Sequence, residues 1–131
     1  MKPFAYRIKL GDTDAAGRLY FVAAFRIAHD AFEEAMATIG LPVHEIVQRG
    51  NFAFPVVHAD ATYSAPVLLG DMVYVNTLVK RVGNSSVNFQ YEIKNAAGEI
   101  AIKVEIIHVS ISAETGETIP LPDPLRTLLS R

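Results

Sequence analysis

The sequence predicts an α+β protein in which one long helix packs on one face of an antiparallel sheet. In residues 4–10 every second side chain is large and apolar, and these side chains fall on one side, as in a half-buried strand. Residues 22–39 repeat their apolar side chains at steps of three and four, which is the period of an α-helix. After Asn51 no further helical period of any length appears, and strand patterns follow one another. A strand, a helix and then a run of strands is typical of α+β architecture.

The helix predicted over residues 22–39 is expected to be largely covered by other elements. One stripe of apolar side chains runs along it, formed by Phe25, Ala28, Phe32, Ala35 and Ile39. Other alanine and aliphatic side chains widen the stripe, so polar residues are the minority. Gly40 and Pro42 end the helix, because glycine accepts the left-handed conformation and proline cannot continue the backbone ladder. A short helix is expected next, over residues 43–49 and closed by Gly50.

The second half of the chain is expected to complete a five-stranded sheet. Residues 72–82 and 86–94 form two strands around a Gly-Asn-Ser turn, and the second of them alternates strictly. Residues 99–112 follow as a longer strand after a loop of hairpin length. Two prolines confine the extended segment 52–67 to an edge, a bulge or a bend. One helix covers only part of such a sheet, so the uncovered apolar surface predicts a two-fold dimer.

Composition bounds the classes of function. A chain of 131 residues with 50% hydrophobic and 20% charged residues has the length and balance of one globular domain, which we expect to span residues 1–131. Its net charge of −2 gives no broad attraction to nucleic acid or to a membrane surface. The chain has no cysteine, which removes disulfides, thiolate metal sites and cysteine nucleophiles. No signal peptide or membrane-spanning run is seen, and a cytoplasmic setting is expected.

The stretch that could carry chemistry is Gly11–Phe21, GDTDAAGRLYF, directly before the long helix. Its two acids, Asp12 and Asp14, admit two interpretations from the residues alone. One is structural, because acids near a helix start bond backbone N–H groups and are stabilised by the helix dipole. The other is a catalytic carboxylate. A calcium loop is excluded, because Ala16 and Ala23 occupy positions that need oxygen ligands.

The same stretch carries a family resemblance. The run Gly11–Gly17, followed by residues 19–21 and a long helix, resembles the N-terminal signature of hot-dog-fold thioesterases of the 4-hydroxybenzoyl-CoA thioesterase family. The order of the predicted elements is similar to that of the family as well. The resemblance implies a hot-dog fold, in which the sheet wraps around one long central helix. Within the family the chain is most similar to 1,4-dihydroxy-2-naphthoyl-CoA thioesterases, through three further stretches: residues 29–33, 52–59 and 120–122.

This resemblance implies a role for several residues. Asp14 would be the catalytic carboxylate, acting as a nucleophile on the thioester carbonyl or as a general base for water. The backbone N–H of Phe21 would stabilise the oxyanion, which agrees with the unpaired N–H groups and positive dipole end of a helix N-terminus. No strong general acid is needed, because the coenzyme A thiolate is a good leaving group. The substrate-binding residues would be Gly17, Tyr20, His29 and His58.

The implied reaction is hydrolysis of an aromatic acyl-CoA to the free acid and coenzyme A, with dihydroxynaphthoyl-CoA of phylloquinone and menaquinone synthesis as the first candidate. The implied assembly is a homodimer or homotetramer with the active site at the dimer interface, working without a metal or other cofactor. Alternatives are a thioesterase for other acyl-CoA or acyl-carrier-protein substrates, and a non-catalytic module that binds acyl thioesters.

His29 also fits an ordinary surface pair with Glu33 one helical turn away, and His58 fits an interior histidine. His44 and His108 carry no signal above background.

Overall fold

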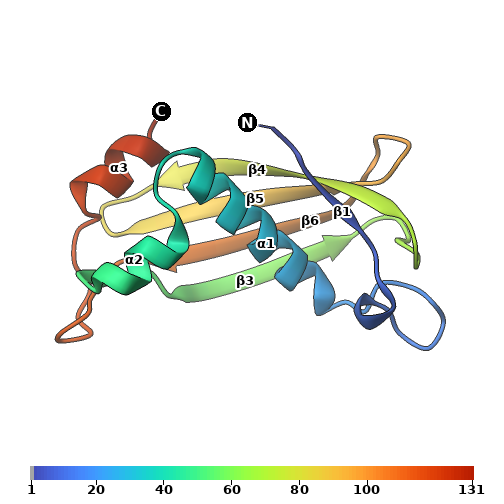
Figure 1. Cartoon of the computed structure of the whole chain (residues 1–131), viewed down its shortest axis with the longest axis horizontal. Coiled ribbons are helices and arrows are strands. Elements are labelled where there is room, and N and C mark those ends of the chain that lie inside the picture. Colours follow the sequence, from blue (N-terminus) through green and yellow to red (C-terminus); the bar gives the residue numbers. More distant parts are fainter. Residues whose placement is uncertain (1) are drawn as a thin grey trace.

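A five-stranded antiparallel sheet, with the longest helix lying across one of its faces, dominates the structure, a computed structural model that describes residues 2–131 (Figure 1). A 3-10 turn over Leu10–Asp12 follows the first strand. The other elements, in chain order, are β1 (Phe4–Arg7), α1 (Ala23–Thr38), α2 (Val43–Arg49), β2 (Phe52–Ala53), β3 (Val56–Tyr63), β4 (Met72–Val82), β5 (Ser86–Lys94), β6 (Ile100–Val109), β7 (Ile111–Ser112) and α3 (Asp123–Leu129).

The α+β class and the antiparallel sheet are confirmed, but the described chain has three helices rather than one long central helix alone. The short helix expected before Gly50 is α2, and Gly50 closes it in the left-handed conformation, with a φ of 64°. The third helix, α3, begins directly after Pro122 and carries a second proline in its first turn, where a missing N–H costs nothing. Its buried residues Leu125 and Leu129 join the core.

Strand order in the large sheet is β1-β4-β5-β6-β3. The bounds predicted for β4 and β5 are confirmed, whereas the long strand predicted over residues 99–112 is divided into β6 and β7. Ser110 lies buried at this division and donates a hydrogen bond of 2.6 Å to the Ile119 carbonyl, which allows the chain to leave the large sheet. β7 then pairs with β2 in a separate two-stranded sheet.

The eight-residue strand β3 forms the long edge of the sheet. It pairs with β6 along one side, and all but one of its residues are exposed. Ala59 lies opposite the buried Ile106, whereas His58 lies opposite Ile107 on the other face. The two prolines of the segment stand outside the strand, Pro55 before it and Pro66 after it, as their missing N–H groups require.

The core lies between α1 and the sheet. On α1 the buried positions form two adjacent columns that face the strands: Ala23, Ala24, Ile27, Ala28, Ala31, Phe32, Ala35 and Met36. Most of these side chains are small, so the helix can lie close to the sheet and hold its N-terminal turn in a fixed place. β5 supplies the opposite wall through every second residue: Val87, Phe89, Tyr91 and Ile93. The packing of α1 against the sheet therefore fixes the position of its first turn and of the loop before it.

Candidate active site at the start of the long helix

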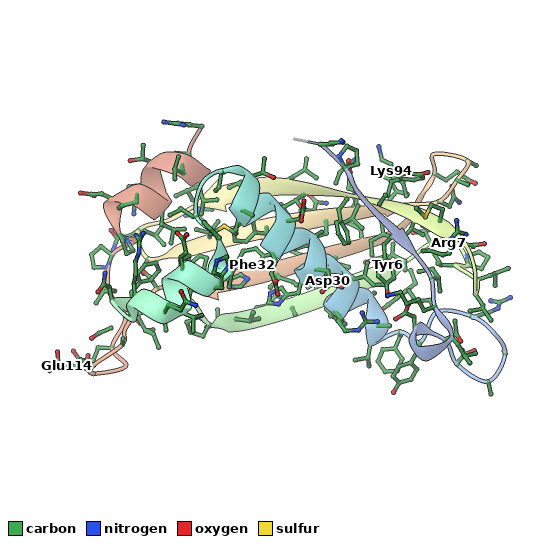
Figure 2. The ribbon with its side chains drawn as sticks, in the orientation of Figure 1. Tyr6, Arg7, Asp30, Phe32, Lys94 and Glu114 are labelled. Carbon is green, nitrogen blue, oxygen red and sulfur yellow. The ribbon has the colours of Figure 1, made fainter. Side chains whose placement is uncertain are left out.

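Asp12 is the buried anchor of the acidic loop, with only 3% of its surface exposed. Its carboxylate accepts hydrogen bonds from the Lys9 N–H and the Tyr6 hydroxyl, each 2.8 Å long, and forms an ion pair with Arg26 of α1. Burial alone would raise the pKa of Asp12, but the hydrogen bonds from Lys9 and Tyr6 and the Arg26 charge outweigh it and hold that pKa below its ordinary value. Figure 2 shows Tyr6 on β1, beside the N-terminal half of α1.

Asp14, by contrast, is exposed at the tip of the same loop. Its Oδ1 accepts hydrogen bonds from the N–H groups of Ala16 and Arg18, at 2.9 and 3.2 Å. The loop is closed by a 2.7 Å bond from the Asp14 N–H to the Arg18 carbonyl and by Gly17, whose φ of 75° favours glycine. Within residues 2–131, Oδ2 makes no hydrogen bond. The loop thus orients the carboxylate through one oxygen and leaves the other available.

Phe21 lies two residues before the first residue of α1 and is 59% exposed. Its carbonyl accepts a hydrogen bond from the Tyr63 hydroxyl at the end of β3, which ties the helix entry to the edge strand. Its N–H has no partner among the described residues, as is usual for the first N–H groups of a helix. Tyr20 is also exposed, and its ring centre lies 5.0 Å from that of Phe21.

An open pocket of about 390 Å³ adjoins Phe21. It lies between the end of the acidic loop and the chain that leaves β3, and its lining includes Arg18, Leu19, Tyr63, Pro66 and Val67. The lining is mainly apolar with one cation at the rim. Such a pocket can accept an apolar group whose other end carries negative charge.

His29 lies two helical turns further along α1, where it meets a second histidine. Its Nε2 is 3.4 Å from Nε2 of His108, and the Nδ1 of His108 is 2.8 Å from the Phe54 carbonyl. Burial lowers the pKa of His108 to about 4, and it also lowers that of His29, although Glu33 and Asp30 act in the opposite direction. Both pKa shifts favour the neutral form of the ring. Figure 2 labels Phe32, which packs on both.

His58 lies apart from these groups within one chain. Its Nε2 is 2.8 Å from Oδ2 of Asp60, and both side chains are more than half exposed. Because His58 pairs with Ile107 and its neighbour Ala59 faces the core, the His58 side chain lies on the sheet face opposite α1. The role predicted for it as a substrate-binding residue stays a prediction.

Four of the predicted site residues lie together in one loop and helix start: Asp14, Gly17, Tyr20 and Phe21. The ion pair of Asp12 with Arg26 and the contact of Tyr63 with Phe21 were not predicted, since both join distant segments. His108 was detectable, because it follows Val104 and Ile106 at alternate positions of a strand and therefore falls on the core face. In residues 2–131 no cluster of three or more histidine or acidic side chains could hold a metal ion.

An antiparallel sheet crossed by a long helix, with an acidic loop at the helix start, is the architecture that the sequence predicted for a hot-dog-fold thioesterase. The model of the Thioesterase-like superfamily matches residues 8–129, and the chain belongs to that superfamily. It is 31% identical to the 1,4-dihydroxy-2-naphthoyl-CoA hydrolase of Synechococcus elongatus over 123 residues, covering 93% of this chain and 90% of the relative. A hydrolase of the same name from Microcystis aeruginosa is 31% identical over 124 residues, covering 95% of this chain and 89% of the relative.

Among solved structures, the crystal structure of a 1,4-dihydroxy-2-naphthoyl-CoA thioesterase from Synechocystis superposes with a TM-score of 0.91 at 29% identity. The match covers 98% of this chain and 95% of that one. The chain is thus an enzyme of the thioester hydrolase class. None of the helices in residues 2–131 has the length and apolarity needed to cross a membrane.

Proposed function

We propose that the chain acts as one domain that hydrolyses a hydroxylated aromatic acyl-CoA, with 1,4-dihydroxy-2-naphthoyl-CoA as the first substrate. This is the compound named in its relatives from Synechococcus and Synechocystis. The observation that carries the proposal is that two groups occur in the same loop and helix start: an Asp14 carboxylate oriented through one oxygen, and a Phe21 N–H that has no hydrogen-bond partner within residues 2–131. Thioester hydrolysis needs these two functions, an activating base or nucleophile and an oxyanion donor.

Two routes are open to the Asp14 oxygen that the loop leaves available. As a general base it takes a proton from a water molecule, and that water attacks the thioester carbonyl carbon. As a nucleophile it attacks the same carbon directly. The carbonyl oxygen gains negative charge beside the Phe21 N–H, where the helix dipole is favourable. Collapse of the tetrahedral intermediate breaks the carbon–sulfur bond and releases the coenzyme A thiolate. Where Asp14 has attacked, water then hydrolyses the mixed anhydride. Both routes consume one water molecule and need no metal or other cofactor.

The substrate class is tested by thiol release from a panel of acyl-CoA esters. We expect the highest kcat/KM with 1,4-dihydroxy-2-naphthoyl-CoA, a lower value with benzoyl-CoA, and the lowest with aliphatic esters of similar size. A preference for aliphatic esters would contradict the aromatic substrate class, although the chain would still be a thioesterase. Binding without thiol release from any ester would favour a non-catalytic module.

We also propose that the active site is completed by a second copy of the chain, paired along β3. Within one chain, His29 is about 12 Å along the helix from Phe21, at a rise of about 1.5 Å per residue. The Tyr63 end of β3 holds Phe21, whereas the Val56 end lies opposite His108. A two-fold axis through an antiparallel β3 pair exchanges these ends, so each Phe21 would approach the partner's histidine pair. The exposed edge of β3 and its exposed Val56 and Val57 support this arrangement.

The proposed dimer predicts that an acidic side chain on β3 will lower the dimer fraction and the activity together. The variant is Val57→Asp, at a position that is 60% exposed in one chain. Val47→Asp is the matched control, because Val47 is 73% exposed but lies on α2. Sedimentation velocity and thiol release are measured on both variants. A wild-type chain that sediments as a fully active monomer would contradict the shared site.

A further inference from the structure

His108 has a single possible proton position when it is neutral. A carbonyl oxygen only accepts hydrogen bonds, so the 2.8 Å contact with the Phe54 carbonyl requires the proton on Nδ1. Its Nε2 then carries a lone pair and acts as an acceptor. The ring is 2% exposed, and three phenylalanine rings surround it, with centres 4.7 to 5.5 Å away: Phe32, Phe54 and Phe89. The three phenylalanine rings offer no hydrogen-bond acceptor to compete with the Phe54 carbonyl for the His108 N–H.

His29 is constrained in turn by His108. The planes of the two rings are within 16° of parallel, and their centres are 5.4 Å apart while the two Nε2 atoms are 3.4 Å apart. The rings therefore meet edge to edge, in the geometry of a nitrogen-to-nitrogen hydrogen bond. Because Nε2 of His108 is the acceptor, Nε2 of His29 must donate. The Nδ1 of His29 is left as a lone pair, without a hydrogen bond to any residue in 2–131.

We propose that His108 is a positioning residue that fixes the tautomer of His29, so that His29 presents an acceptor nitrogen to the acyl group and selects substrates with a hydroxyl that donates to it. The proposal rests on the proposed function, in which His29 reaches the acyl ring. It assigns the enzyme's preference for a hydroxylated acyl group to three groups joined by hydrogen bonds: the Phe54 carbonyl, His108 and His29. A site that offers a fixed acceptor leaves it unpaired when the substrate hydroxyl is missing, and this disfavours the unhydroxylated analogue.

The kinetic test compares 1,4-dihydroxy-2-naphthoyl-CoA with 2-naphthoyl-CoA, which has the same rings without hydroxyls. In His108→Phe, which keeps the aromatic packing, we expect kcat/KM for the hydroxylated ester to fall about tenfold, the equivalent of one lost hydrogen bond. The value for 2-naphthoyl-CoA should stay within about twofold, because that ester gains nothing from the fixed acceptor. His108→Gln, whose amide can donate and accept, should recover part of the preference. His44→Phe, on the exposed face of α2, is the matched control.

Nitrogen-15 NMR of the ligand-free protein tests the tautomers without any substrate. Wild type should show His108 protonated on Nδ1 and His29 on Nε2, and His108→Phe should release His29 into a mixture of tautomers. A wild-type His29 protonated on Nδ1 would overturn the proposal. An equal fall in kcat/KM for both esters in His108→Phe would overturn it as well. If the tautomers are as expected but no acyl-CoA is hydrolysed, the proposed function fails, and the role of His108 in that reaction falls with it.

Discussion

Replacing Asp14 by asparagine is expected to lower kcat for thioester hydrolysis by about 10² to 10⁴-fold, the usual contribution of a positioned base. The amide cannot take a proton from water or attack a carbonyl, so the chemical step is lost. Its oxygen can still accept the N–H groups of Ala16 and Arg18, which keeps the loop closed. Asp14 is exposed, and stability should therefore change little. Thiol release at saturating substrate and a urea unfolding curve measure the two effects.

Asp123→Asn is the matched control for this experiment. It removes one exposed carboxylate of the same kind, at the start of α3 and far along the chain from the acidic loop. Its kcat should equal that of wild type. Full activity of Asp14→Asn on a good substrate would show that another group activates the water, although the family and the fold would stand.

The second large effect is expected from Asp12→Ala, which should lower the free energy of unfolding by about 3 kcal/mol. The substitution leaves the Lys9 N–H, the Tyr6 hydroxyl and the Arg26 guanidinium without their shared acceptor. Activity should fall as well, because these side-chain contacts hold the backbone of Asp12, whose carbonyl accepts the Tyr20 N–H at the far end of the loop. Urea denaturation at pH 7 measures the change in stability.

The stability difference between wild type and Asp12→Ala should depend on pH in a defined direction. The pKa of Asp12 is lower in the folded chain than its ordinary value of 3.8. Its contribution is therefore complete above about pH 5, and it is lost as the pH falls through the lower pKa of the folded chain. Asp60→Ala is the control, because its exposed pair with His58 should contribute less than about 1 kcal/mol. A difference below 1 kcal/mol for Asp12→Ala at pH 7 would contradict the anchoring role.

Much of the fold could be predicted because the local patterns agree with the tertiary structure. The alternation of β5 and the apolar period of α1 both report which side chains face one core. The division between β6 and β7 could not be predicted, because the strand pattern continues across Ser110 and the break depends on a contact with Ile119. Likewise, the helical pattern predicted α1 well, but α3 owes its place to the packing of Leu125 and Leu129.

The loop of the candidate site could be predicted, but its supports could not. Asp12 and Asp14 look equivalent in sequence, yet one is buried in an ion pair and the other is exposed. The difference comes from Arg26 and Tyr6, which reach Asp12 from α1 and β1. The contact of His29 with His108 joins residues 79 positions apart and depends on the whole sheet lying under the helix. One amino-acid sequence taken by itself carries no record of such a pair.

The position of β3 at the edge of the sheet has a thermodynamic consequence if the active site is shared between two copies. Substrate that contacts both chains binds the dimer more tightly than the monomer, and mass action then makes substrate promote association. Specific activity should decline on dilution below the dimer dissociation constant, and a slowly hydrolysed analogue should move that decline to lower protein concentration. The unpaired edge of one strand would in this way make the enzyme's activity depend on its own abundance.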